Sequence, residues 1–267
     1  MHRIHAVHQG AAITLEFDED VYQPGSLTEM LADLMEVNPG DRVVDVGCGT
    51  GYLGIIAALL GAGEVICIDP EPNAVKWTKH NAGLNKVNNV TAYLGRELDP
   101  VEHLPVDLIV TLPPQMPFPT NFNPWRYGGK DGSDVIIKII CQAARMLNPG
   151  KGKLYLLHAA LAFPARVREK LAVCGFEWQT VKTVERELNP AEFYQLAPGL
   201  MEYILELYRR GMAELIQRDG QWYYPIWFYR ALLSERVKKS EESGGQGYLQ
   251  SFPTAVIKSQ KAEGGRQ

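Results

Sequence analysis

The sequence lacks the charge excess and the long apolar runs that mark several large classes of protein. Lysine and arginine number 27 against 31 aspartates and glutamates, which gives a net charge of −4. Domains that bind nucleic acid usually carry an excess of basic residues, so we do not expect a nucleic-acid acceptor. No apolar run approaches the length that spans a membrane, and residues 1–5 contain no signal-peptide core. These absences predict a cytoplasmic protein without a membrane partner.

Cysteine and histidine are also too sparse to indicate a disulfide framework or a metal centre. The four cysteines are scattered and form no C-x-x-C pair, so we expect reduced, mostly buried thiols. These residues are Cys48, Cys67, Cys141 and Cys174. His2, His5 and His8 recur at every third position and could chelate a metal. The alternative, which we favour, is a flexible or edge segment without a metal.

What the sequence does contain is a regular alternation of strand and helix patterns. Apolar residues make up 46% of the chain and charged residues 22%, which is typical of a globular domain with one core. Strands are predicted at 12–17, 42–46, 64–68, 90–94, 107–111, 153–158 and 177–187. Helices are predicted at 26–35, 53–60, 73–82, 133–147 (capped by Ser133 or Asp134), 164–173 and 199–215. The alternation predicts an α/β fold with a doubly wound, mostly parallel sheet.

The two ends of the chain differ from this alternating core. An N-terminal strand and helix occupy residues 1–40, and a helical insertion at about 197–216 precedes the hairpin signal Asp219-Gly220. A late antiparallel hairpin strand is therefore expected. We predict one domain over residues 1–235 and a polar, flexible tail over 236–267. The sequence contains no internal repeat and does not reveal an oligomeric state.

The most informative segment runs from Val43 to Gly51, with the sequence Val-Val-Asp-Val-Gly-Cys-Gly-Thr-Gly. Alternating glycines let the backbone turn sharply and approach a ligand closely. The helix that follows points its free N–H groups into the same space. A nucleotide-like ligand at the end of this strand is therefore expected.

Two ligands fit this loop. Gly49, Gly51 and Gly54 match the G-x-G-x-x-G of a dinucleotide site, with Asp69 as the acid on the next strand. The alternative is the pattern Asp-x-Gly-x-Gly-x-Gly, which resembles the first motif of class I S-adenosylmethionine-dependent methyltransferases. Asp45 favours this alternative, because an ionised carboxylate repels a pyrophosphate but attracts an α-ammonium and a sulfonium.

The acids at the ends of the next two strands extend the cofactor site. Asp69 can accept both ribose hydroxyls, although Pro70 and the residues after it also permit a helix cap. After the third strand of the core, Glu97 is our candidate for the adenine amino group, with Arg96 at the position where an acid is commonest. The predicted cofactor residues are Thr28, Asp45, Gly47, Cys48, Gly49, Gly51, Asp69, Pro70, Glu97 and Thr111.

Over residues 20–160 the chain resembles the methyltransferase small-domain group that contains the glutamine methyltransferases of peptide release factors. Three segments carry the likeness: Pro24-Gly25-Ser26-Leu27-Thr28-Glu29, Asn81-Ala82-Gly83-Leu84-Asn85 and Gly128-Gly129-Lys130-Asp131-Gly132. The resemblance implies a Rossmann-like methyltransferase fold and S-adenosyl-L-methionine as cofactor. It also places the acceptor loop at Leu112-Pro113-Pro114-Gln115, where that family carries Asn-Pro-Pro-Tyr.

The acceptor loop departs from the family at two positions. Leu112 replaces an asparagine and cannot accept a hydrogen bond, and Gln115 replaces a tyrosine. The Pro113 carbonyl still can accept one. Amide methylation of a release factor therefore does not carry over to this chain. Tyr22, Trp125 and Tyr127 are candidates for the pocket wall, or for packing.

The sequence thus predicts transfer of a methyl group from S-adenosylmethionine to a protein or small-molecule acceptor. Little covalent help from the protein is required, because the sulfonium is already activated and orientation supplies most of the rate. Two alternatives stay open: a cofactor-binding protein without catalysis, which Leu112 and Gln115 would explain, and a NAD-dependent oxidoreductase.

Overall fold

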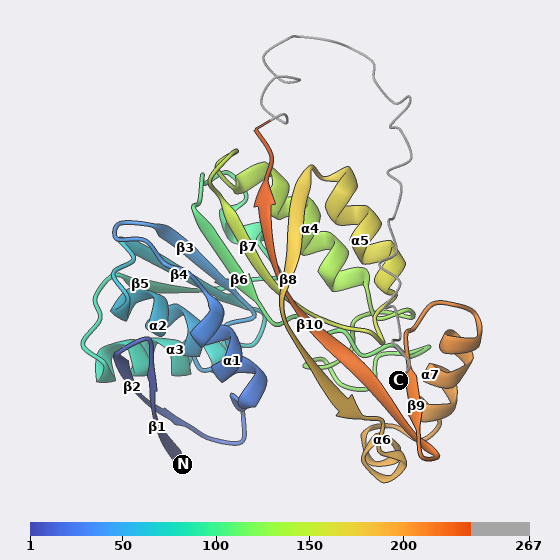
Figure 1. The fold of residues 1–267 in the computed structure, drawn as a ribbon. Coiled ribbons are helices and arrows are strands. Elements are labelled where there is room, and N and C mark those ends of the chain that lie inside the picture. The colour runs from blue at the N-terminus through green and yellow to red at the C-terminus, as the bar shows by residue number, and fades with distance from the viewer. Residues whose placement is uncertain (236–267) are drawn as a thin grey trace, which may run out of the picture.

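The computed structural model describes residues 1–235, in which helices cover both faces of one large sheet (Figure 1). The predicted tail of residues 236–267 lies outside this range. The strands are β1 (His2–His8), β2 (Ala11–Phe17), β3 (Arg42–Val46), β4 (Glu64–Asp69), β5 (Val90–Leu94), β6 (Leu108–Thr111), β7 (Lys153–Ala159), β8 (Phe176–Glu187), β9 (Ile216–Arg218) and β10 (Gln221–Leu233). The α-helices are α1 (Ser26–Leu34), α2 (Tyr52–Leu59), α3 (Pro72–Leu84), α4 (Asp134–Met146), α5 (Pro164–Val173), α6 (Pro190–Leu196) and α7 (Leu200–Arg209), and a short 3-10 helix spans Asp99–Val101.

The large sheet has the strand order β5-β4-β3-β6-β7-β10-β8, with β9 paired to β10. The five strands from β5 to β7 are parallel, and β10 is antiparallel to both β7 and β8. The chain winds outward from β3 through β4 to β5 and then crosses back to β6 beside β3. Such a reversal leaves a crevice at the carboxyl ends of the two central strands, where α/β proteins bind ligands. The predicted doubly wound fold with a late antiparallel strand is confirmed.

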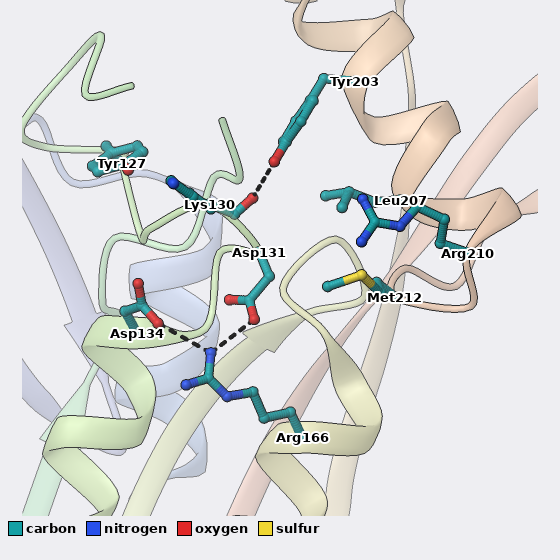
Figure 2. Close-up of a pocket in the computed structure, with 9 residues that line it drawn as sticks. All are labelled: Tyr127, Lys130, Asp131, Asp134, Arg166, Tyr203, Leu207, Arg210 and Met212. Atoms are coloured by element: carbon teal, nitrogen blue, oxygen red, sulfur yellow. Dashed lines mark hydrogen bonds and ion pairs between the residues drawn. The ribbon is translucent and has the colours of Figure 1, made fainter. Parts of the chain in front are cut away.

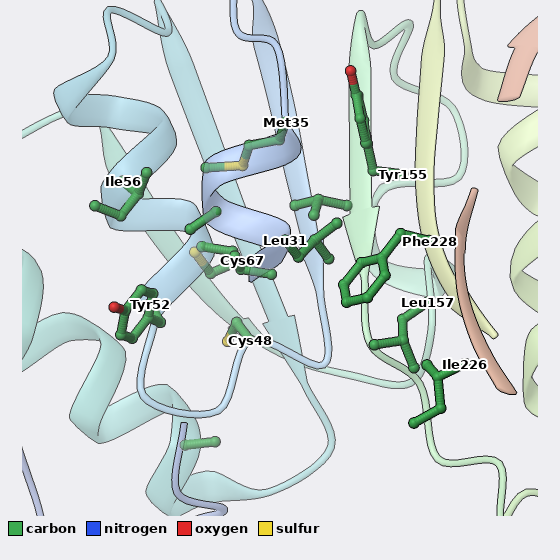
Figure 3. Close-up of a cluster of buried hydrophobic side chains, with 14 of the residues drawn as sticks. Leu31, Met35, Cys48, Tyr52, Ile56, Cys67, Tyr155, Leu157, Ile226 and Phe228 are labelled. Carbon is green, nitrogen blue, oxygen red and sulfur yellow. The ribbon is translucent and has the colours of Figure 1, made fainter. Parts of the chain in front are cut away.

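Successive residues of the central strands point to opposite faces of the sheet and pack in two separate hydrophobic cores. Val43 packs on the face that carries α1, α2 and α3, whereas Val44 and Val46 pack on the face that carries α4 and α5. Figure 3 shows the first core, in which Cys48 and Cys67 lie between the helices and the sheet. Both thiols are buried, as the sequence predicts. Both faces of the sheet are therefore covered, as a parallel sheet requires.

The N-terminal segment forms an antiparallel hairpin, β1–β2, rather than a loose end. His8 is buried, with its Nδ1 2.7 Å from a carboxylate oxygen of Asp33 and its Nε2 2.6 Å from the hydroxyl of Tyr52. Tyr52 opens α2, so this contact ties the hairpin to the helix that follows the glycine loop. The edge segment expected from the sequence is therefore an ordered edge strand.

The boundaries of the predicted elements differ from the observed ones by at most two residues, except around the helical insertion. The apolar stripe predicted one helix over 199–215, whereas α7 ends at Arg209 and a second helix, α6, precedes it. The end is fixed by Gly211, whose φ of 71° is left-handed. The Met212 N–H then donates to the Leu207 carbonyl at 2.8 Å, the pattern of a Schellman cap. None of the helices within residues 1–235 is both long enough and apolar enough to cross a membrane.

Candidate cofactor and acceptor site

The glycine loop follows β3 at the reversal of the sheet and turns directly into α2. Gly47, Gly49 and Gly51 have φ values of 74°, 53° and 84°, a region that residues with a Cβ rarely adopt. The N–H groups of Gly47 and Cys48 donate to the Ile68 carbonyl at 2.8 and 3.1 Å, which fastens the loop to β4. A Cβ at Gly47 would have no atom within 4 Å, so this side of the loop is open.

Asp69 at the end of β4 bonds directly to the glycine loop. One carboxylate oxygen accepts the Gly49 N–H at 2.9 Å, and the other accepts the Glu71 N–H at 3.0 Å. Burial raises the pKa of Asp69, and the two backbone donors oppose that rise. Each carboxylate oxygen has a further lone pair, so Asp69 can still accept two hydroxyls. The hydrogen bond from Glu71 closes the turn before α3, as expected if Asp69 caps that helix. It does not exclude the other interpretation, in which Asp69 binds the ribose.

Asp45 lies beneath the loop rather than on its open side. Its side chain is 2% exposed, and it accepts the N–H of Gly54 at 2.9 Å. Burial raises the pKa of Asp45 to about 7. A Cβ at Gly54 would overlap Cys67 Sγ, so only glycine lets α2 approach β3 and β4 this closely. In this position Asp45 fixes the first turn of α2 against the strand.

Two side chains of α3 donate hydrogen bonds to backbone carbonyls of the glycine loop. Thr78 donates from Oγ1 to the Gly49 carbonyl at 3.2 Å and lies 3.3 Å from Cys48 Sγ. Asn81 donates from Nδ2 to the Thr50 carbonyl at 2.9 Å. Neither residue was predicted at the site, although the segment that begins at Asn81 was one of those that carry the family likeness. The side chain of Cys48 faces this buried network.

The remaining predicted cofactor residues are Thr28, Pro70, Glu97 and Thr111, and the structure gives each of them its own local contacts or exposure. Thr28 accepts the Gly25 N–H with Oγ1 at 3.4 Å at the start of α1. Thr111 is fully buried and donates to the Val46 carbonyl at 3.0 Å. The carboxylate of Glu97 lies 2.6 Å from Lys138 Nζ. Pro70 is exposed at the end of β4.

The predicted acceptor loop leaves β6 and is fastened by Gln115. The Gln115 Oε1 accepts the Ala159 N–H at 2.5 Å, and its Nε2 donates to the carbonyls of Leu157 and Pro113 at 3.4 and 3.3 Å. Gln115 therefore joins the exit of β6 to the end of β7. Leu112 is partly buried and packs against the first core.

A glycine-rich segment, residues 128–132, packs on this acceptor loop. A Cβ at Gly128 would lie 2.5 Å from Gln115 Cα, and one at Gly132 would lie 2.5 Å from the Gln115 carbonyl oxygen. Only glycines permit so close an approach. Hydrogen bonds of 2.7 Å from Met116 N–H to the Arg126 carbonyl and of 3.0 Å from Gly128 N–H to the Met116 carbonyl complete the contact. The segment and the loop therefore form one unit.

Aromatic residues connect this unit to the chain that precedes α1. The rings of Tyr22 and Trp125 meet edge to face with centroids 6.5 Å apart. The Arg126 guanidinium lies 5.6 Å from the Tyr22 ring centre. Backbone near this contact also reaches the glycine loop, because the Tyr22 carbonyl oxygen would be 3.5 Å from a Cβ at Gly49. Tyr22 thus lies between the glycine loop and Trp125.

A pocket of about 490 Å³ lies beside the glycine-rich segment, and Figure 2 shows the residues that line it. It is lined by Tyr127, Lys130, Asp131, Asp134, Arg166, Tyr203, Leu207, Arg210 and Met212. Tyr203 of α7 donates its hydroxyl to the Lys130 carbonyl at 3.0 Å. Apart from Tyr127, these residues were not predicted at a site. Those of α5 and α7 reach the segment only in the folded chain, and Lys130 and Asp131 were noted only as part of the family likeness.

The amino-acid sequence matches a family model over residues 25–111, that of the ribosomal protein L11 methyltransferases. An L11 methyltransferase of Acetivibrio thermocellus is 49% identical over 85 residues, 31% of this chain and 27% of that protein. One of Geobacillus kaustophilus is 33% identical over 150 residues, 56% of this chain and 42% of that protein. The chain therefore spans less than half the length of these L11 methyltransferases.

A putative protein N5-glutamine methyltransferase of Methanocaldococcus jannaschii matches over a larger share of its length. It is 31% identical over 174 residues, which are 62% of this chain and 85% of that protein. The chain belongs to the class I S-adenosylmethionine-dependent methyltransferases. The resemblance drawn from the glycine loop is thereby confirmed.

Solved methyltransferase structures share the fold of this chain. A precorrin-6y C5,15-methyltransferase of Geobacter metallireducens has a TM-score of 0.52 at 12% identity and covers 82% of this chain and 94% of its own. A 16S rRNA N2 G1207 methyltransferase of T. thermophilus, solved with AdoMet and guanosine, has a TM-score of 0.53 at 22% identity over 68% of this chain and 47% of its own. At these identities the likeness concerns the fold.

Proposed function

We propose that this protein transfers the methyl group of S-adenosylmethionine to a protein acceptor. The observation that carries the proposal is the bond between Asp69 and Gly49 N–H at the open end of the sheet. This bond places the Asp69 carboxylate, which has lone pairs left to accept hydrogen bonds, beside the glycine loop. No atom would lie within 4 Å of a Cβ at Gly47, so the loop is open there. Family membership supports the same cofactor.

The residues at this end of the sheet fit that cofactor chemically. Asp69 can accept the hydroxyls of a ribose, and the open face at Gly47 leaves room that a Cβ would fill. Glu97 and Arg96 are the candidates beside the adenine. S-adenosylmethionine supplies a methyl group already activated by its positive sulfur, so the protein needs mainly to orient the acceptor and exclude water.

The acceptor loop would orient the incoming nucleophile. The Pro113 carbonyl oxygen accepts Gln115 Nε2 at 3.3 Å, and its second lone pair stays available for a donor on the acceptor. Leu112 would supply an apolar wall where the release-factor enzymes have asparagine. Tyr22 and Trp125 would shield the space between this loop and the glycine loop.

A protein acceptor is favoured over a small molecule by the relatives. The archaeal relative is named as a putative protein N5-glutamine methyltransferase, and the two bacterial ones as L11 methyltransferases. The side-chain amide chemistry of the first does not transfer directly, because Leu112 cannot accept a hydrogen bond from the amide.

Calorimetry and a transfer assay test the proposal in sequence. We expect the full chain to bind S-adenosylhomocysteine and not NAD. NAD binding without a response to S-adenosylhomocysteine would instead favour the oxidoreductase. With methyl-labelled S-adenosylmethionine and a cell lysate, we expect label in protein. Cofactor binding without transfer to any lysate component would favour the non-catalytic alternative.

A further inference from the structure

We propose that Asn81 is a positioning residue for the cofactor, because its side-chain amide joins the N-terminal hairpin β1–β2 to the glycine loop. The inference rests on the proposed function, since it names a residue that keeps the loop in the shape that binds S-adenosylmethionine. Asn81 lies within α3 and is fully buried. Burying an amide costs free energy unless its polar atoms are paired, so the partners of Asn81 identify what it holds.

The Asn81 amide bonds to two parts of the chain that are distant in sequence. Its Oδ1 accepts the Glu16 N–H at 2.8 Å, and its Nδ2 donates to the Glu16 carbonyl at 3.0 Å. The same Nδ2 donates to the Thr50 carbonyl at 2.9 Å. Both hydrogens of the amide are therefore used, one on β2 and one on the glycine loop.

Asn85, one helical turn later at the end of α3, bonds to β2 in the same way but not to the loop. Its Oδ1 accepts the Thr14 N–H at 2.8 Å, and its Nδ2 donates to the carbonyls of Thr14 and Asn81 at 2.6 and 2.8 Å. Thr14 and Glu16 are two residues apart on β2, so these bonds lie along one edge of the strand. The two asparagines fasten the hairpin to α3, and Asn81 extends that attachment to the loop.

The carbonyls of the glycine loop are turned toward α3 at two successive positions. Thr78 donates to the Gly49 carbonyl at 3.2 Å, and Asn81 donates to that of Thr50. Because a trans peptide is planar, the Thr50 N–H points the opposite way from the Gly49 carbonyl, away from α3. This N–H forms no hydrogen bond in the part of the chain that the structure describes, although Thr50 is only 2% exposed.

The unpaired Thr50 N–H is a donor that a ligand can use. A buried donor without a partner costs free energy, and an acceptor atom of the cofactor would remove that cost. Its direction depends on the bonds that hold the neighbouring peptides, because glycines on both sides of Thr50 permit many backbone conformations. The Gly51 N–H donates to the Cys48 carbonyl at 2.8 Å. Asn81 and Cys48 thus hold the two ends of the Thr50–Gly51 peptide, and loss of Asn81 would leave it with one attachment.

The hairpin also contacts the residue that follows the loop. His8 of β1 lies with its Nε2 2.6 Å from the Tyr52 hydroxyl. The hairpin therefore reaches the loop through Thr50 and the first turn of α2 through Tyr52. Of these two contacts, the one through Asn81 acts on the peptide backbone of the loop itself.

Calorimetry on the full-length protein with S-adenosylhomocysteine tests the inference. We expect Asn81→Ala to weaken binding about 3- to 10-fold, because one hydrogen bond that shapes the loop is lost. Asn85→Ala is the matched control, since it loses the same pair of bonds to β2 but none to the loop. Its affinity should stay at the wild-type value. Both variants should lower Tm by about 3–8 °C, so a loss of stability alone does not separate them.

Nuclear magnetic resonance of the ¹³C,¹⁵N-labelled protein supplies a readout that stability does not move. Without ligand, the ¹³C′ signal of Thr50 should shift in Asn81→Ala and stay in place in Asn85→Ala. In the wild type, saturating S-adenosylhomocysteine should shift the Thr50 amide and the side-chain amide of Asn81, and leave the side-chain amide of Asn85 unchanged. These wild-type signals decide the question even if Asn81→Ala does not fold.

Equal losses of affinity in the two variants, or wild-type affinity in Asn81→Ala, would overturn the inference and leave the proposed function in place. A Thr50 amide signal that does not respond to S-adenosylhomocysteine would do the same. Absence of S-adenosylhomocysteine binding by the wild type would overturn the proposed function, and with it the role of Asn81 toward the cofactor.

Discussion

The glycine loop after β3 and the acceptor loop after β6 lie at the same edge of the sheet but are built differently. The first is held by neighbours that the resemblance to the family includes, such as Asp69 and Asn81. The second departs from the family at Leu112 and Gln115 and is held by residues distant in sequence, including Ala159 of β7. This difference suggests a cofactor region that follows the family and an acceptor region adapted to a different partner.

The largest effect should come from filling the contact between α2 and the sheet. Gly54→Val would overlap Cys67 and crowd Asp45. We expect a loss of about 3 kcal/mol or more in the free energy of unfolding, at or above the usual range for overpacked cores. Urea unfolding followed by circular dichroism measures it.

Gly83→Ala is the matched control for that substitution. Gly83 lies within α3, and a Cβ there would meet no atom within 4 Å. We expect it to stabilise the protein by about 0.5–1 kcal/mol, because alanine is the better helix former. A valine variant as stable as the wild type would show that α2 does not need this close approach.

Asp69 tests the cofactor side of the comparison directly. Asp69→Ala should weaken S-adenosylhomocysteine binding by about 1.5–3 kcal/mol, or roughly 10- to 150-fold, because charge-assisted bonds to two hydroxyls are lost. Asp69→Asn keeps an acceptor for the Gly49 N–H and should lose less. Calorimetry on folded variants makes the measurement. Wild-type affinity in the alanine variant would restrict Asp69 to its turn with Glu71.

Asp45 should give the cofactor region a pH-dependent stability. Burial raises its pKa in the folded protein from 3.8 to about 7, so between these values the folded state holds a proton that the unfolded chain releases. Asp45 therefore favours folding below about pH 4, and this contribution is lost as the pH rises to about 7.

Asp45→Asn removes the titration and keeps an oxygen for the Gly54 N–H. Relative to the wild type, its free energy of unfolding should rise by about 2.6 kcal/mol between pH 5 and pH 8. Other titrating groups cancel in this difference because both proteins contain them. Parallel stability curves over this range would show that Asp45 titrates normally.

The sequence predicted the strand, the glycine loop and the helix of the proposed cofactor region because their signals are local. Asp45 near the end of β3, the glycines and Asp69 follow one another along the chain, and the strand and helix patterns that carry them are regular. The same reasoning did not reveal that Asp45 faces the interior, because its partner Gly54 is identified only once α2 is placed on the sheet.

The acceptor region was less predictable because its contacts join distant segments. Gln115 was recognised as a donor and acceptor, but its partner Ala159 lies on a different strand 44 residues later. The pocket required α7 to reach Lys130, 73 residues earlier in the chain. The predicted single helix over 199–215 also missed the break at Gly211, since the apolar stripe continues past it.

The smallest effect should come from Gln115 and would sharpen the contrast between the two loops. Gln115→Met keeps the length of the side chain but leaves the buried Ala159 N–H without its acceptor. We expect a loss of about 1 kcal/mol in the free energy of unfolding, since the carbonyls of Pro113 and Leu157 lose only long contacts of 3.3 and 3.4 Å.

Gln179→Met is the matched control, because Gln179 is exposed on β8, at the edge of the sheet; it should change stability by less than about 0.5 kcal/mol. Because Gln115 bonds to β7 and not to the glycine loop, S-adenosylhomocysteine affinity should stay at the wild-type value in both variants. Transfer to the lysate acceptor should fall only in Gln115→Met, where the loop loses its attachment. If cofactor affinity fell together with transfer, the two loops would act as one unit, and the separation of a family-like cofactor region from an adapted acceptor region would be wrong.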